Sequence, residues 1–146
     1  MIEAARIIMA GYSGTPLSKK LGIKDAHRVV SLHAPEGFAK TLVPMPDGVD
    51  LGESLAGKQP IDVILLFCKD QKIFAKDFPK AAARLAQNGG LWVCWPKKSS
   101  GMASDLSENP IRDLGLAAGL VDNKVCAVDE IWSGLRFVIR VKDRKG

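Results

Sequence analysis

The sequence predicts an α/β fold, a three-layer sandwich in which helices cover both faces of a mostly parallel sheet that ends in an antiparallel hairpin. Strand-like apolar runs alternate with amphipathic helical segments along most of the 146 residues, and this order is typical of parallel sheets. The last two strand-like runs are separated by only a short polar connection, which favours an antiparallel pair.

The N-terminal part is expected to form a short helix followed by a strand. Thr15 is a favourable N-cap, Pro16 suits the first helical position, and Gly22 can end the helix in a left-handed conformation. Residues 27–33 are rich in β-branched side chains and stop just before a proline, which predicts a strand. A brief turn or helix at residues 37–41 should follow.

In the middle of the chain, strands and helices alternate. A strand at residues 49–51 is expected to be short and weak, because prolines and a glycine precede it. Residues 61–68 are continuously apolar after Asp62, as in a strand that is covered on both faces. Asp70 should cap a helix whose apolar residues recur at helical spacing as far as Leu85, with a break or kink at Pro79.

The C-terminal part is expected to contain a strand, a helix and a hairpin. The turn at residues 88–90 leads into a strand rich in tryptophan. Ser107 should cap a helix that ends at Gly115. Two β-rich runs, at residues 124–128 and 135–141, then form the antiparallel hairpin.

Length and composition indicate one globular domain covering residues 1–146. The chain is 47% hydrophobic and 25% charged, the usual mix for a soluble domain. Its net charge is +5, but the basic tail at residues 140–146 holds four basic residues and one acid, so it contributes +3 of that charge. No basic face with stacking or base-reading groups can be traced, which argues against nucleic-acid binding. The sequence leaves open whether residues 1–10 are flexible.

Location and redox state are also constrained by the sequence. No apolar run approaches the ~20 residues of a transmembrane helix, and the apolar run that follows Arg6 is too short for a signal peptide. A cytoplasmic protein that does not enter membranes is therefore expected. The three cysteines lie far apart within apolar runs and are odd in number, which argues against a disulfide framework and predicts core thiols, with a reactive or metal-bound cysteine as the alternative. They are Cys68, Cys94 and Cys126.

Candidate ligand-binding residues follow the tryptophan-rich strand. Lys97 and Lys98 supply positive charge, and Ser99 and Ser100 supply hydroxyl donors, for a phosphate or carboxylate group. In open α/β sheets, ligands bind beyond the carboxyl ends of the strands, where this loop should lie. The alternative is an ordinary solvated loop.

Further candidates come from other strand ends. Glu36 and Gly37 follow the first strand and should face the same crevice, where Glu36 acts as a general base or forms an ordinary ion pair with a lysine. Trp95 at a strand end and Trp132 in the hairpin loop are candidates for stacking on a ligand. His33 is the plausible proton carrier. No residue set indicates a metal site, no catalytic group is assigned, and the cofactor is unknown.

The C-terminal half resembles a known architecture. An apolar strand, a helix, a Gly-Gly turn with a strand, a helix ending in Leu-Gly and a terminal hairpin follow one another. The matching segments are Asp62-Val63-Ile64-Leu65-Leu66, Gly89-Gly90-Leu91-Trp92-Val93, Leu114-Gly115-Leu116 and Phe137-Val138-Ile139. This order resembles the second half of a Rossmann-like methyltransferase domain. The resemblance implies S-adenosylmethionine, held by a Gly-x-Gly-x-Gly turn after the first strand and an acid after the second.

The sequence departs from that pattern in both places. The turn at residues 34–38 holds one glycine, and no clear second strand presents an acid, although Asp47, Asp50 and Glu53 lie nearby. Three phrases are also similar to the bacterial domain of unknown function 3052 family, which implies a bacterial cytosolic protein and carries no activity. They are Gly11-Tyr12-Ser13-Gly14-Thr15-Pro16-Leu17, Leu91-Trp92-Val93-Cys94-Trp95-Pro96-Lys97 and Gly119-Leu120-Val121-Asp122-Asn123-Lys124-Val125-Cys126.

Three functions remain open on this basis. The first is a non-catalytic or weakly catalytic protein that binds a small anionic ligand at the strand carboxyl ends. The second is a divergent S-adenosylmethionine-dependent methyltransferase-like enzyme. The third is a protein-interaction module whose C-terminal hairpin docks a partner or a second copy of the chain, since an exposed hairpin edge can pair with another strand.

Overall fold

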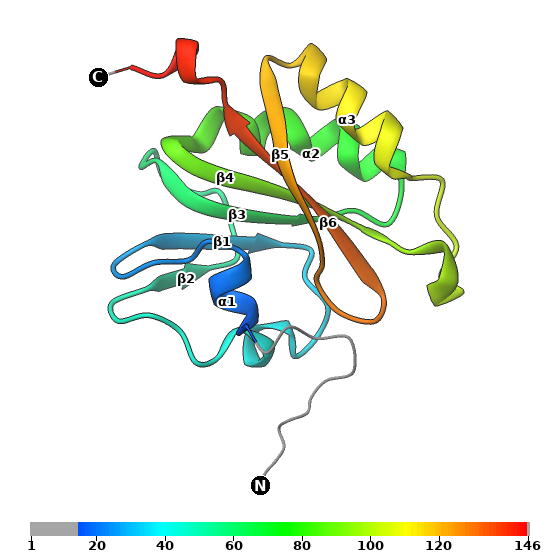
Figure 1. The fold of residues 1–146 in the computed structure, drawn as a ribbon, viewed down its shortest axis with the longest axis horizontal. Coiled ribbons are helices and arrows are strands. Elements are labelled where there is room, and N and C mark those ends of the chain that lie inside the picture. The colour runs from blue at the N-terminus through cyan, green and yellow to red at the C-terminus, as the bar shows by residue number, and fades with distance from the viewer. Residues whose placement is uncertain (1–14, 146) are drawn as a thin grey trace, which may run out of the picture.

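The computed structural model describes residues 15–145 (Figure 1). Its strands are β1 (Arg28–Leu32), β2 (Asp50–Gly52), β3 (Ile61–Phe67), β4 (Leu85–Pro96), β5 (Leu120–Ala127) and β6 (Trp132–Ile139). The α-helices are α1 (Leu17–Lys20), α2 (Gln71–Arg84) and α3 (Glu108–Ala117), and the 3-10 helices are η1 (Phe38–Leu42), η2 (Lys98–Ser100) and η3 (Val141–Asp143). Residues 1–10, whose order the sequence leaves open, and residues 11–14 of the first family-like phrase lie outside the described residues.

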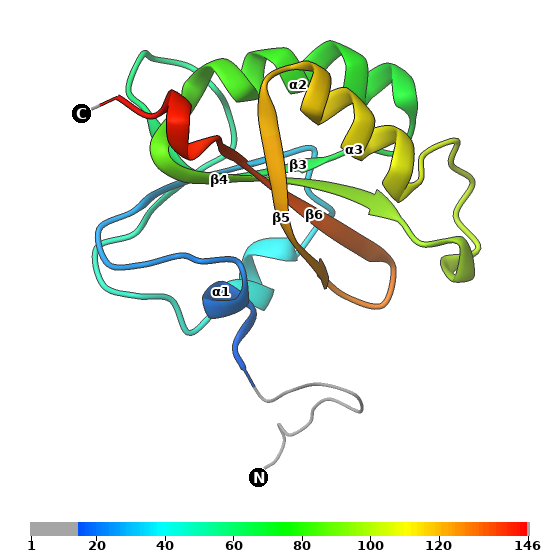
Figure 2. The same ribbon diagram turned by 45° about the horizontal axis from the view of Figure 1, so that its top comes forward.

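The strands form a six-stranded sheet in the order β2-β1-β3-β4-β6-β5. The first four strands along the sheet are parallel, whereas β6 is antiparallel to both of its neighbours. Helices α2 and α3 cover one face, and α1 and η1 lie against the other (Figure 2). The predicted fold class, a three-layer Rossmann-like sandwich with a C-terminal antiparallel hairpin, is confirmed.

The central strand β3 supplies both hydrophobic cores. Its side chains alternate between the faces, so Ile64 and Leu66 join the core beneath α2 and α3, whereas Val63 and Leu65 join the core on the α1 side. Ile64, Leu65 and Leu66 are all fully buried. This explains the continuous apolar run, since a strand covered on both faces has no solvent-facing positions.

Helix α2 begins where it was expected. The Asp70 carboxylate accepts a hydrogen bond from the Ile73 N–H at 2.9 Å and so caps the helix. The expected break at Pro79 is absent, because α2 runs from Gln71 to Arg84 through it. Phe74 and Phe78 on the buried side of the helix pack into the core beneath it, and this packing offsets the loss of one backbone hydrogen bond at the proline.

Three expected element boundaries are wrong. Helix α1 has Pro16 as its N-cap, so Thr15 does not cap it. Residues 88–90 do not form a turn, because β4 continues through them with a register shift against β3. A Cβ at Gly89 would lie 2.6 Å from the Asp62 carbonyl oxygen, so glycine permits this close strand approach. Gly115 lies inside α3, which continues to Ala117.

The order of the strands creates a switch point between β1 and β3. The chain passes from β1 to β2 on one side, and from β3 to β4 on the other. The carboxyl ends of β1 and β3 therefore part at this place, which is where open α/β sheets usually bind ligands. Among residues 15–145, no helix is long and apolar enough to cross a membrane.

Candidate functional site

At the switch point, a histidine and an aspartate form a close pair. His33 directly follows β1 and has a φ of 59°, an uncommon conformation for a residue other than glycine. Its Nε2 lies 2.6 Å from Oδ2 of Asp77 on α2, and the two side chains are 51% and 16% exposed. With Nε2 engaged by the carboxylate, Nδ1 is the ring nitrogen that can exchange a proton with a bound molecule.

The carboxyl end of β2 presents an acid, which corrects the sequence-based expectation. A second strand does form, pairing with β1 through Arg28–Asp50, Val29–Leu51 and Val30–Gly52. Glu53 follows the last of these residues and is exposed. Because β1 and β2 are parallel neighbours, Glu53 and His33 follow adjacent strand ends. The sequence places Glu53 near the expected second strand, but it does not show that Glu53 directly follows that strand. A strand of three residues is too short to have a recognisable hydrophobic pattern.

The loop after β1 is short, and the chain re-enters the hydrophobic core at Phe38. Glu36 and Gly37 are both exposed, and Gly37, with a φ of 81°, precedes η1. The Phe38 N–H donates to the Pro35 carbonyl at 3.0 Å, and its ring is buried. Glu36 forms no ion pair within the described part of the chain, so the expected pairing with a lysine is absent.

An aromatic row fills the α1 side of the sheet at its carboxyl end. The ring of Phe38 meets Phe67 edge-on at 4.9 Å between centroids, and Phe67 meets Trp132 in the same way at 5.1 Å. Trp132 is the first residue of β6 and not part of the turn, and it is only 5% exposed. Trp95 is 7% exposed and joins the core beneath α2 and α3. Both indoles are therefore built into the hydrophobic cores.

The basic loop after β4 is anchored to the hairpin turn. The Lys97 ammonium donates to the Asp129 carbonyl at 2.9 Å, and the Lys97 N–H donates to the Ile131 carbonyl at 2.8 Å. Ser100 turns its hydroxyl back to the Lys97 carbonyl at 2.6 Å. Lys98 and Ser99 remain exposed. The structure thus brings residues 97–100 together with the β5–β6 turn, and no hydrogen bond or ion pair links them to Glu36 among the described residues.

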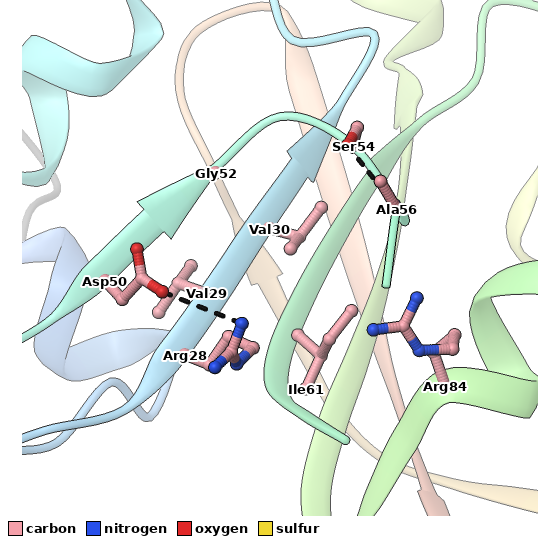
Figure 3. A pocket seen from close by; sticks show the side chains of 9 residues that line it. All are labelled: Arg28, Val29, Val30, Asp50, Gly52, Ser54, Ala56, Ile61 and Arg84. Atoms are coloured by element: carbon pink, nitrogen blue, oxygen red, sulfur yellow. Dashed lines mark hydrogen bonds and ion pairs between the residues drawn. The ribbon is translucent and has the colours of Figure 1, made fainter. Parts of the chain in front are cut away.

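A small polar pocket is lined by residues of β1, β2 and the loop that follows β2 (Figure 3). It has a volume of about 70 Å³, well below the roughly 300 Å³ of a pocket for a small organic ligand. Its lining includes Arg28, Asp50 and Ile61, the first residues of β1, β2 and β3, and also Gly52 and Ser54, which flank Glu53. The Arg84 guanidinium holds the loop over it by donating to the carbonyls of Leu55 and Gln59. The pocket is too small for a cofactor.

The cysteines behave as core thiols. Burial raises the pKa of Cys68 to about 12, with smaller contributions from Asp77 and Asp70. Burial likewise raises the pKa of Cys94 well above its usual value, and raises that of the partly buried Cys126. No group of histidines, cysteines and acids suited to a metal ion occurs among the residues that the structure describes.

This burial predicts slow thiol chemistry and a loss of stability in alkali. In native protein at neutral pH, Ellman's reagent should modify Cys126 first, and Cys68 and Cys94 only after unfolding. The pKa of Cys68 is about 12 in the folded protein, and the reference value is 9.0. The contribution of this buried, protonated thiol to the free energy of unfolding is therefore complete below pH 9.0 and declines as the pH rises towards 12. A Cys126→Ser variant is the control, and rapid native-state labelling of that variant would contradict the assignment.

Comparison with known proteins identifies the architecture. No protein-family model and no curated protein matches the chain. Among solved structures, it is similar to the ribosomal protein L11 methylase of Lactobacillus delbrueckii subsp. bulgaricus, with a TM-score of 0.55 and 10% identity over 84% of this chain and 74% of that one.

Two further structures show the same likeness. A TehB-like SAM-dependent methyltransferase of Corynebacterium glutamicum has a TM-score of 0.55 and 8% identity, covering 90% of this chain and 91% of that one. The fibrillarin pre-rRNA processing protein of Methanococcus jannaschii has a TM-score of 0.54 and 12% identity, covering 86% and 69%. At such identities the likeness shows a shared fold, the Rossmann-like methyltransferase architecture.

Proposed function

We propose that the protein is a divergent methyltransferase-like enzyme that binds S-adenosylmethionine at the switch point, across the carboxyl ends of β1, β2 and β3. The observation that carries this proposal is Glu53, an exposed acid directly after β2, whose neighbouring strand β1 is followed by His33. The architecture shared with methyltransferases supports the same placement. Fold alone does not specify activity, so the proposal depends on these side chains.

The residues at the switch point suit the ribose of S-adenosylmethionine better than its methionine part. Glu53 can accept hydrogen bonds from the two ribose hydroxyls, as acids in this position do in nucleotide-binding folds. The turn after β1 has a single glycine, and Pro35 lacks an N–H donor, so the methionine part would need contacts other than a glycine-rich turn. We therefore expect weaker binding than in an enzyme that has both features.

The residues around the site define a chemical role for each. S-adenosylmethionine would supply an electrophilic methyl group. Glu53 orients the ribose, and His33 accepts the proton that a nitrogen or oxygen acceptor loses on methylation. The Asp77 carboxylate, 2.6 Å from His33 Nε2, holds the ring by accepting the hydrogen bond of that N–H. Asp70 is already engaged in capping α2, so it is not assigned to the ligand.

Thermal unfolding with S-adenosylhomocysteine tests the proposal. Ligand at a hundred times its dissociation constant should stabilise the protein by roughly 2.7 kcal/mol, a rise in Tm of ~5–10 °C. Glu53→Gln should remove most of this rise, whereas Asp50→Asn at the opposite end of β2 should keep it. His33→Gln should keep the rise and abolish methyl transfer. No rise at millimolar ligand would refute the proposal.

Other sequence-based expectations remain proposals. A small anionic ligand at Glu36, Gly37 and residues 97–100 is supported by the exposure of Lys98 and Ser99, but Lys97 already donates to Asp129. Membership of the domain of unknown function 3052 family, a cytoplasmic location, and partner or self-association through the hairpin are likewise predictions. The hairpin proposal is supported by β5, which is an edge strand with Val125 49% exposed.

A further inference from the structure

Arg136 is a partly buried cation on the α1 side of the sheet. It lies in the middle of β6, opposite Trp92 of β4 and Lys124 of β5. Its guanidinium occupies space that Gly90 leaves open, and it lies in van der Waals range of Gly22. A Cβ at Gly90 would fall 2.7 Å from the guanidinium carbon, and a Cβ at Gly22 would lie 3.9 Å from Nη2. Glycine at position 90 of β4 therefore makes room for the Arg136 side chain, which lies over this strand.

No acid among residues 15–145 pairs with this charge. Within residues 15–145, the ion pairs involve Arg28, His33 and Arg112, and Arg136 takes part in none. Its hydrogen bond is a long one, 3.4 Å from Nη1 to Asn123 Oδ1. A guanidinium has several N–H donors in one plane, and in the described part of the chain this amide oxygen is the acceptor that Arg136 engages. Taking such a group partly out of water is costly unless an anion compensates it.

The surroundings add positive charge. Burial lowers the pKa of Arg136, and the nearby charge of Arg144 lowers it further. Lys124, directly across the hairpin, extends its ammonium group to the Lys20 carbonyl at 3.1 Å. The Arg144 side chain is held at the end of β6 by its bond to the Ile139 carbonyl at 3.0 Å. Two further cations, Lys124 of β5 and Arg144 of the C-terminal segment, therefore lie near a guanidinium that has no acidic partner within residues 15–145.

We propose that Arg136 anchors a binding site for the phosphate group of a small molecule, with Lys124 and Arg144 at its rim. A planar guanidinium can donate two parallel hydrogen bonds to a phosphate, and a lysine adds a point charge. A polynucleotide is disfavoured, because single-stranded nucleic acids need exposed rings for stacking. Every tryptophan and phenylalanine in the described part of the chain is buried.

This site is separate from the switch point. Gly90 pairs with Val63 near the amino end of β3, whereas the switch point lies beyond Phe67 at the other end of the same strand. The inference therefore does not depend on the proposed methyltransferase-like function. Either site can fail its own test without affecting the other.

Titration with pyrophosphate and inorganic phosphate tests the site. Calorimetry at low ionic strength should show saturable pyrophosphate binding, and the amide resonances of Gly22, Gly90 and Asn123 should shift with it. Arg136→Gln should weaken binding roughly tenfold or more, because it removes charge-assisted hydrogen bonds. Arg28→Gln, which removes the same charge from the opposite face, should change the affinity by less than about twofold, a screening effect only.

A conservative variant guards against a folding artefact. Arg136→Lys keeps the charge but loses the paired donors, so it should weaken pyrophosphate binding by an intermediate factor of roughly three. Absence of saturable binding at millimolar pyrophosphate would overturn the proposal, as would equal weakening by Arg136→Gln and Arg28→Gln. Tighter, Arg136-dependent binding of a short single-stranded RNA would overturn the assignment to a small molecule.

Discussion

Replacing Trp92 with alanine should lower the free energy of unfolding by about 3–5 kcal/mol, the usual cost of removing a large buried aromatic side chain. Trp92 is 0% exposed and is among the largest fully buried side chains. Its indole N–H also donates to the Leu21 carbonyl at 3.0 Å, which joins the central sheet to the end of α1. The substitution therefore removes a core contact and a link between layers together.

The control for this prediction is Trp92→Phe. A phenyl ring fills much of the same space but cannot donate to Leu21, so the loss should fall to about 1–2 kcal/mol, chiefly the cost of an unsatisfied buried carbonyl. Urea unfolding followed by circular dichroism measures both values. A Trp92→Ala variant that loses less than about 1 kcal/mol would mean that the core collapses around the missing ring or is packed differently.

Gly115→Ala should also destabilise the protein, although alanine is the better helix former. A Cβ at this position would lie 2.5 Å from Cζ of Phe137 and closer still to Cε1. Phe137 is fully buried and in ring contact with Phe78, so it has little room to move. The gain in helix propensity is about 1 kcal/mol, and the overpacking outweighs it. We expect a net loss of about 1–3 kcal/mol.

A double-mutant cycle isolates this steric cause. In a Phe137→Leu background the obstructing ring is absent, so Gly115→Ala should be neutral or stabilising there. Thermal and urea unfolding of the four proteins give the coupling energy. A Gly115→Ala substitution that destabilises equally in both backgrounds would show that contact with Phe137 is not the reason for glycine at this position.

Much of the fold could be predicted, because local patterns reflect local physics. The uninterrupted apolar run of β3 indicated a strand covered on both faces, and the Asp70 cap indicated where α2 begins; both are confirmed. Predictions failed where a residue acts through a distant contact. Gly115 and residues 88–90 carry ordinary helix-end and turn signals, but here glycine is needed because Phe137 and the Asp62 backbone approach closely.

The candidate site was only partly foreseen, for a related reason. His33 was singled out as a proton carrier, but its partner Asp77 lies 44 positions further along the chain. Glu53 was noticed, yet only pairing with β1 shows that it follows a strand. Trp95 and Trp132 were expected to be open to a ligand, and the packing of both sheet faces buries them. No pattern in the sequence indicated that Arg136 lacks an acidic partner.

The sequence by itself determined the class of fold and the order of its elements, since hydrophobic periodicity and capping residues act over a few neighbouring positions. The tertiary structure alone decided which side chains meet. It brought His33 to Asp77, placed Glu53 beside the end of β1, and set Arg136 over Gly90 with no acidic partner in the part of the chain that the structure describes. Such contacts join residues that are far apart along the chain, so they arise only when the strands pair and the helices pack against the sheet.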